Sequence, residues 1–158
     1  MSDDVRSPAE NTLTDLILTL FRVNNLTLTW GDRMVAPLGL TSARWQILGV
    51  IAYAERPQPV AWLARDLGAS RQNVQRIVNA LEQDDIVAFE PNPHHKRANL
   101  VVLTQKGRQV YDEALRLYAP RANALCRGIV QDDLDAARRV MVALKTRLEA
   151  NLDDEEQA

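Results

Sequence analysis

The chain has 158 residues, enough for one domain of ordinary size, and 46% of them are hydrophobic and 25% charged. That balance is typical of soluble globular proteins and excludes a disordered chain. The single cysteine, Cys126, excludes an intrachain disulfide and a multi-cysteine zinc site, and it fits the reducing cytoplasm. Residues 1–6 lack the features of a signal peptide, and no apolar run approaches the ~18 residues that span a bilayer. We therefore expect a cytoplasmic protein without a membrane partner.

The net charge of −2 hides an uneven distribution. Residues 153–156 are all acidic and form a tail of charge −4, which leaves +2 for the rest of the chain. From His94 to Arg108, by contrast, four basic residues occur without an acidic one. The sequence therefore predicts a local basic region within a mildly acidic protein.

The first predicted helix begins after Ser7, which suits the N-cap position. Pro8 suits the first helical position, and Glu10 completes a capping box. The helix is expected to continue to about Gly31. Apolar residues recur along it at steps of three and four, as in an amphipathic helix: Leu13, Leu16, Ile17, Leu20 and Phe21.

A second helix follows a linker that contains Pro37 and Gly39. Thr41 suits its N-cap, and Pro57 and Pro59 are expected to end it. Its apolar residues are Trp45, Ile47, Leu48, Val50 and Ile51.

The centre of the chain predicts a helix, a tight turn, a second helix and a hairpin. A short helix over about 60–67 is followed by Gly68, where a left-handed conformation costs little. The next helix covers about 71–84, and strand-like runs follow at 86–90 and 100–103. Two helices joined by a short turn form a helix-turn-helix, and the hairpin directly after it is a wing.

The helix predicted over 71–84 has two faces of contrasting composition. Its apolar face, which must point to the core, consists of Val74, Ile77, Val78 and Leu81. Its exposed side carries amides and a guanidinium, where an ordinary solvent face would carry Glu–Lys pairs. Asn and Gln can bond adenine and Arg can bond guanine, chiefly near the start of a recognition helix. The predicted DNA-binding residues here are Ser70, Arg71, Gln72, Asn73, Gln75, Arg76 and Asn79.

The loop over 91–97 would form the tip of the wing, and it places four side chains of basic character in succession. Arg97 is predicted to enter the minor groove, while His95 and Lys96, next to His94, contact phosphates. The alternatives remain open: a solvated amphipathic helix in a small bundle, and a loop charged for solubility. The two features at this spacing favour DNA more strongly together than either does alone.

Three stretches resemble the MarR family of transcriptional regulators: LTSARWQIL at 40–48, LARDLGASRQNV at 63–74, and LTQKG at 103–107. The order of elements also resembles that family over about residues 7–152. The resemblance implies a mainly α fold with a small β-hairpin wing, in which a winged helix-turn-helix is flanked by dimerisation helices. It also implies a homodimeric repressor whose operator affinity often falls when a small, frequently aromatic or phenolic molecule binds.

On this resemblance the chain divides into four parts. These are an N-terminal dimerisation helix at 1–35, the DNA-binding domain at 40–108, C-terminal dimerisation helices at 104–152, and an acidic tail at 153–158. One departure concerns the wing, which in the family usually reads Asp-x-Arg. Here His95 stands at the acidic position ahead of Arg97, which puts the internal bracing of the wing in question, though not the role of the arginine.

Dimerisation is also expected from the residues themselves. After a long helix from Thr104 to about Arg127 and a break at Gly128, a last helix begins at about Asp132. Its apolar residues alternate at steps of three and four, which makes a heptad seam: Leu134, Ala137, Met141, Leu144 and Leu148. A monomer would expose this seam and the stripe of the first helix, whereas two copies would bury both. The alternative is that the terminal helices pack on each other within one chain.

Other candidate sites are weaker. No phosphate loop, nucleophile elbow or paired metal ligands occur, so neither an enzyme nor a cofactor is expected. His94 and His95 lack a third histidine for a metal site. Cys126 is expected to be a small buried hydrophobe, with a redox-sensing thiol as the alternative.

The resemblance also implies an effector pocket between the dimerisation helices and the DNA-binding core. Trp30, Arg33 and Trp45 are the candidates for its wall, with Trp62 a further one, because an aromatic face near a guanidinium suits a planar anion. Each Trp could instead be simply a core residue. The sequence thus predicts a MarR-like homodimer that binds a pseudo-palindromic operator and regulates transcription. Repression is favoured over activation. The alternative is a winged-helix module that binds protein and not DNA.

Overall fold

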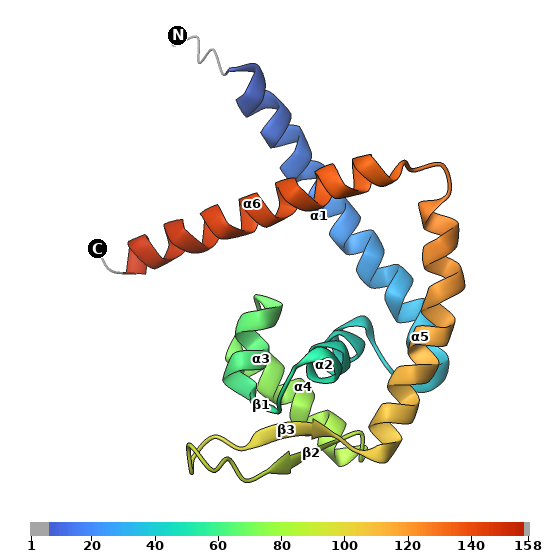
Figure 1. Cartoon of the computed structure of the whole chain (residues 1–158), viewed down its shortest axis with the longest axis vertical. Helices are drawn as coiled ribbons and strands as arrows, with labels where there is room; N and C mark the ends of the chain where they lie inside the picture. The colour runs from blue at the N-terminus through green and yellow to red at the C-terminus, as the bar shows by residue number, and fades with distance from the viewer. Residues whose placement is uncertain (1–6, 157–158) are drawn as a thin grey trace. The chain divides into compact units, whose positions relative to one another are not determined.

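The computed structural model describes residues 7–156 and confirms a mainly helical fold with a small β-sheet (Figure 1). Predictions that fall on residues 1–6 and 157–158 lie outside the described part. No described helix is long and apolar enough to cross a membrane. The elements are α1 (Pro8–Val35), a 3-10 helix η1 (Ala36–Leu38), α2 (Ser42–Tyr53), β1 (Gln58–Pro59), α3 (Val60–Leu67), α4 (Arg71–Gln83), β2 (Val87–Glu90), β3 (Leu100–Leu103), α5 (Gln105–Cys126) and α6 (Gln131–Glu156).

The described part of the chain divides into two compact units, one that ends at Ala119 and one that begins at Pro120. The division falls within α5 at Pro120. A proline inside a helix has no amide hydrogen to donate to the carbonyl four residues earlier, so the helix is weakest there. The first unit contains the helix-turn-helix and the sheet, and the second contains the end of α5 and all of α6.

Helix α1 begins as predicted, with a complete capping box between Ser7 and Glu10. The predicted end at Gly31 was wrong, because α1 continues for another turn to Val35. Gly31 is buried against α2, and a Cβ at this position would lie 2.3 Å from Ser42 Oγ. The Ser42 hydroxyl donates to the Leu28 carbonyl (2.8 Å), which leaves no room for a larger residue at 31. This glycine therefore serves close helix packing and does not end the helix.

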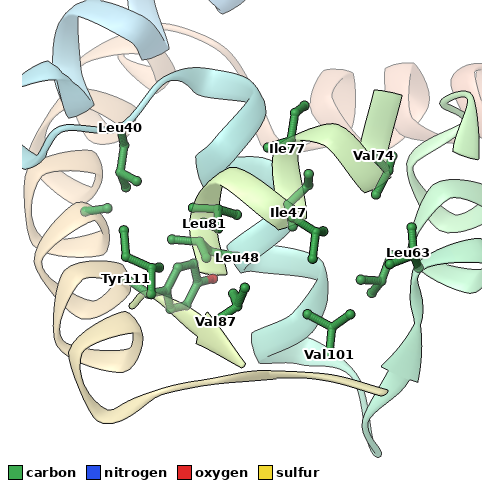
Figure 2. Packing of buried hydrophobic residues seen from close by; sticks show 14 of the residues in the cluster. Leu40, Ile47, Leu48, Leu63, Val74, Ile77, Leu81, Val87, Val101 and Tyr111 are labelled. Atoms are coloured by element: carbon green, nitrogen blue, oxygen red, sulfur yellow. The ribbon is translucent and has the colours of Figure 1, made fainter. Parts of the chain in front are cut away.

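The core of the first unit is built around α2 and α4 (Figure 2). The four apolar residues predicted for the inner face of α4, from Val74 to Leu81, are all buried. They meet Ile47 and Leu48 of α2, with Tyr111 of α5 in the same cluster. Burial of this face fixes which side of α4 remains exposed.

The sheet has three strands in the order β1-β3-β2, all antiparallel. The predicted hairpin is β2–β3, in which Val87 pairs with Leu103 and Glu90 with Leu100. Strand β1 was not predicted, because a two-residue strand shows no alternation and its prolines indicated only a helix end. The actual end of α2 is Tyr53, earlier than the prolines.

The second unit consists mainly of α6, which follows a turn at Gly128 with φ of +81°. The predicted seam lies along this helix, where Leu134, Met141 and Leu148 are exposed. The helix continues to Glu156, so the segment predicted as an acidic tail is helical as far as that residue.

Candidate nucleic-acid interface

The start of α4 is fixed by a tight turn and a side-chain cap. Gly68 adopts a left-handed conformation with φ of +61°, which ends α3 and redirects the chain. The Ser70 hydroxyl then accepts a hydrogen bond from the Asn73 amide (3.3 Å), which satisfies one free amide of the first turn of α4. Local sequence thus positions the first turn of α4 where the prediction placed it.

The polar residues of α4 lie on its exposed side. Gln72, Asn73, Arg76 and Asn79 are exposed, and Gln75 is half-buried. No acidic residue occurs in the first turn, so a polyanion can approach the amide groups at this helix end without charge repulsion. The structure therefore brings the predicted base-reading residues onto one accessible surface.

Two hydrogen bonds organise these side chains. Gln75 Nε2 donates to Asn79 Oδ1 (2.8 Å), and one Arg76 guanidinium nitrogen donates to Asn73 Oδ1 (3.1 Å). Each bond uses only part of the capacity of its partners, because an amide has two donors and two lone pairs and a guanidinium has five donors. The remaining groups are available for the edge of a base.

The wing tip is braced by Asn92, a residue that the sequence analysis missed. Its side chain donates to the Ala98 carbonyl (3.0 Å) and accepts from the His94 amide (3.0 Å). The Ala98 amide also donates to the His95 carbonyl (3.0 Å). The preference of asparagine for such turn bonds, between Pro91 and Pro93, could have indicated this role. The loop is thus ordered by the Asn92 side chain and by a backbone hydrogen bond, although the acidic residue of the family's wing is absent.

His95, Lys96 and Arg97 are exposed in this loop. Figure 1 shows the loop at the free end of the β2–β3 hairpin, beyond the helices of the first unit. The basic side chains are thereby presented at a projecting tip. Among the described residues, no group of three or more His, Cys, Asp or Glu could hold a metal ion.

The residues predicted to bind an effector are only partly gathered. Trp30 and Trp45 are half-buried, and both rings contact Tyr118, with ring centroids at 6.0 and 5.4 Å. Tyr118 was not predicted. Arg33 is exposed in the last turn of α1. Trp62 lies on α3 and is exposed, and the guanidinium of Arg65 is 5.9 Å from the centre of its ring.

A hollow of about 590 Å³ lies along one face of α2, and Trp30, Trp45 and Tyr118 are not among its lining residues. The Oε1 atom of Gln58 is buried without a hydrogen-bond partner in the described part of the chain. Close to this face, burial and a hydrogen bond to Tyr53 raise the pKa of Tyr111 to about 12. The lining residues are Gln46, Gly49, Val50, Tyr53, Ala54, Gln58, Asp66 and Leu67.

The prediction that Cys126 is buried was wrong, since its side chain is exposed. It lies in the last turn of α5, whereas the last buried residue of that helix is Ala114. The end of α5 has left the core, so an apolar neighbourhood in sequence does not imply burial there.

A short helix, a left-handed turn, an exposed polar recognition helix and a hairpin wing define the class of this protein. It is a winged helix-turn-helix protein, a class that binds DNA with the second helix in the major groove.

Comparison with known proteins defines the family. A model of the MarR family matches residues 38–98. Rv2011c, an uncharacterized protein of Mycobacterium tuberculosis, is 35% identical over 134 residues, which cover 82% of this chain and 92% of that protein. BadR, a transcriptional activatory protein of Rhodopseudomonas palustris, is 34% identical over 102 residues, which cover 61% of this chain and 57% of BadR.

The structural match extends beyond the helix-turn-helix. The structure of the repressor CouR of Rhodococcus jostii on a 23-mer DNA duplex matches with a TM-score of 0.72 at 25% identity. The match covers 80% of this chain and 89% of that chain. The chain therefore belongs to the MarR family of winged-helix transcriptional regulators, and its family and fold are those of regulators and not of enzymes.

Proposed function

We propose that this regulator is a homodimeric repressor that reads a pseudo-palindromic operator through the start of α4. The observation that carries the proposal is the exposed face of amides and guanidinium on the first turns of α4. In the proposed complex, Gln72 and Arg76 bond base edges in the major groove, and Ser70, Arg71, Asn73, Gln75 and Asn79 surround them. His95 and Lys96 contact phosphate, and Arg97 enters the minor groove.

Loss of a contact to a base edge and loss of a contact to the DNA backbone should affect DNA affinity differently. Gln72→Ala and Arg76→Ala should each cost about 1–3 kcal/mol of operator binding and relax sequence preference. Arg97→Ala should weaken all sequences more evenly and reduce the salt slope by about one contact. Fluorescence anisotropy on duplexes selected from a random library, measured over a range of salt concentrations, tests both expectations.

The matched control is Arg139→Ala, because Arg139 is exposed on α6 and lies opposite the apolar seam. It should bind DNA like the parent. If the Gln72, Arg76 and Arg97 variants also bind DNA like the parent, the proposal that this surface binds DNA is wrong. The alternative, a winged-helix module that binds protein, is then favoured.

The proposed dimer rests on the apolar surface of the terminal helices. α1 exposes seven large apolar side chains, among them Phe21 at 64% and Leu26 at 70%. α6 exposes the seam that includes Leu134, Met141 and Leu148. Pairing of two copies would remove both surfaces from water, and it would place two recognition helices on half-sites about one helical turn apart.

Repression is proposed because a dimer seated on an operator that overlaps a promoter excludes polymerase. The relatives include both the repressor CouR and the activatory protein BadR. In vitro transcription from a promoter that overlaps the selected operator should therefore fall as protein is added. A rise in transcript would overturn repression while leaving DNA binding intact.

We further propose that a small aromatic or phenolic effector weakens operator binding. CouR has also been solved bound to p-coumaroyl-CoA. In this chain Trp30 and Trp45 meet around Tyr118, and Arg33 lies at the end of the same helix as Trp30. Such a group suits a planar anion.

Titration of tryptophan fluorescence with small aromatic acids tests the effector proposal. An effector should quench the fluorescence and release the operator over the same concentration range. Trp45→Phe should lose this response, whereas Trp62→Phe, on the exposed ring, should keep it. Equal responses in the two variants would contradict the proposed site.

A further inference from the structure

The joint between α4 and β2, residues Asp84, Asp85 and Ile86, is held by side chains from two other helices. The chain turns sharply at this joint, where Asp85 has φ of +58°. From here α4 leads back to the residues proposed to read DNA. The contacts at the joint therefore bear on the direction of α4.

The first contact comes from Arg44 of α2. Its guanidinium donates to the Gly39 carbonyl (3.0 Å) and to the Ala80 carbonyl in the last turn of α4 (3.2 Å), and it forms an ion pair with Asp84. The side chain is only 19% exposed, so these bonds are partly shielded from water. One planar group thus ties the start of α2 to the end of α4.

The second contact comes from the start of α5. Lys106 Nζ donates to the Asp84 carbonyl (2.6 Å), and the Thr104 hydroxyl donates to the Asp85 carbonyl (2.7 Å). The Thr104 amide also donates to the Ile86 carbonyl (3.1 Å). The LTQKG stretch, which follows the joint in the sequence, therefore binds it as well, whereas Arg44 comes from a helix that precedes it.

Gly107 allows this close approach. A Cβ at position 107 would lie 1.9 Å from the carbonyl oxygen of Ile86, well inside the distance that any real Cβ tolerates. The backbone of α5 thus lies directly against the joint. A larger residue would push the two apart.

Capping of the end of α4 does not by itself require the contacts that Arg44 and Lys106 make. The last carbonyls of an exposed helix can be satisfied by water. Here two cations from different helices converge on one short joint, which restricts tilting of α4 as well as fraying of its end. The α4 helix is about 20 Å long, so a tilt of about 5° at the joint moves its start by about 2 Å. A shift of that size breaks a bidentate contact with a base.

We infer that Arg44 and Lys106 are positioning residues that set the direction of the recognition helix, and so determine operator specificity without touching DNA. This inference rests on the proposed DNA-reading role of α4. A relaxed joint lets α4 adopt several directions. Contacts that depend on exact placement are then lost, while the attraction of charge to phosphate remains.

The test compares Arg44→Met and Lys106→Met with the parent and with the control Arg139→Met. The probes are the duplex selected from a random library by the parent, the same duplex with one base pair inserted between half-sites, and a scrambled duplex. Affinities are measured by anisotropy over a range of salt concentrations, and thermal melting followed by circular dichroism reports folding.

Both variants should bind the selected duplex about fivefold to tenfold more weakly and the scrambled duplex like the parent, with an unchanged salt slope. The penalty for the inserted base pair should shrink, because a freer α4 tolerates altered spacing. Arg44→Lys should recover part of the loss, since it keeps the charge but not all of the hydrogen bonds. If Arg44→Met does not fold, Arg44→Lys replaces it as the test variant at this position.

Two results would overturn the inference. A salt slope reduced by about one contact, with equal losses on both duplexes, would make these residues phosphate contacts. Unchanged affinity for all three duplexes would show that the joint holds α4 without them. If the parent itself does not distinguish the selected from the scrambled duplex, the proposed function fails first, and the inference fails with it.

Discussion

Tyr111 shows how a single side chain is altered by its surroundings. It is 4% exposed and packs in the core, with its ring at an edge-to-face angle to that of Tyr53. Burial disfavours the phenolate, and the hydrogen bond to Tyr53 adds to this effect, so the pKa rises from 10.0 to about 12. The folded protein therefore holds this proton more tightly than the unfolded chain does.

This difference predicts a loss of stability in strong alkali. A raised pKa contributes stability that is complete below pH 10 and is lost as the pH rises through about 12. Between these values the free energy of unfolding of the parent should fall more steeply than that of Tyr111→Phe, by up to about 3 kcal/mol. Urea denaturation at several pH values measures both proteins. Tyr118→Phe, which keeps Tyr111, should behave like the parent, and equal slopes for parent and Tyr111→Phe would contradict the expectation.

The turn between α3 and α4 depends on one backbone conformation. The Gly68 amide donates to the Arg65 carbonyl (3.0 Å), and the Ala69 amide donates to the Ala64 carbonyl (2.9 Å). This pairing of amides with the last carbonyls of a helix requires a left-handed residue at position 68. The turn fixes the angle at which α4 leaves α3, while the joint at the other end of α4 fixes its direction from α2 and α5. The recognition helix is thus positioned at both ends.

Gly68→Ala should destabilise the first unit by about 1–2 kcal/mol, because a Cβ disfavours the left-handed conformation. A steric clash is not the reason, since apart from the adjoining residues no neighbouring group lies within 4 Å of a Cβ at that position. Gly49→Ala is the matched control: it is helical, its nearest neighbour is Tyr111 Oη at 3.8 Å, and alanine favours helices there. Urea midpoints should fall for the first variant and stay or rise for the second. Equal midpoints would mean that the turn does not depend on the glycine.

For the whole molecule, the dominant feature is apolar surface on both terminal helices. The stripe on α1 includes Ile17 at 36% and Phe21 at 64% exposed, one helical turn apart. Contiguous apolar surface of this kind usually marks an interface. We therefore expect the long α1 to pair two copies of the chain. The twofold symmetry of that dimer would match the proposed pseudo-palindromic operator.

Charge placed in this stripe should separate the protomers. The double variant Ile17→Asp with Phe21→Asp should raise the dimer dissociation constant more than about tenfold, since two desolvated charges oppose each pairing. Thr19→Asp, at a polar position of the same helix, should remain dimeric. Analytical ultracentrifugation reads the result directly. A parent that sediments as a monomer would instead support packing of the terminal helices within one chain.

The sequence alone determined the features that depend on near neighbours. The capping box at Ser7, the inner face of α4 and the β2–β3 hairpin follow from residues three or four apart, or from strands joined by one loop. The same holds for the exposed face of α4, because the burial of Val74 and its partners fixes the opposite side. Family resemblance in three short stretches then gave the class of protein.

Only the tertiary structure decided the features that join distant residues. The end of α1 depends on Gly31 against Ser42, and the joint of α4 depends on Arg44 and Asp84, which are 40 positions apart. The exposure of Cys126 depends on where α5 leaves the core. Periodicity and capping describe interactions within one helix or hairpin, whereas close approach between elements depends on how their surfaces fit once the chain has folded.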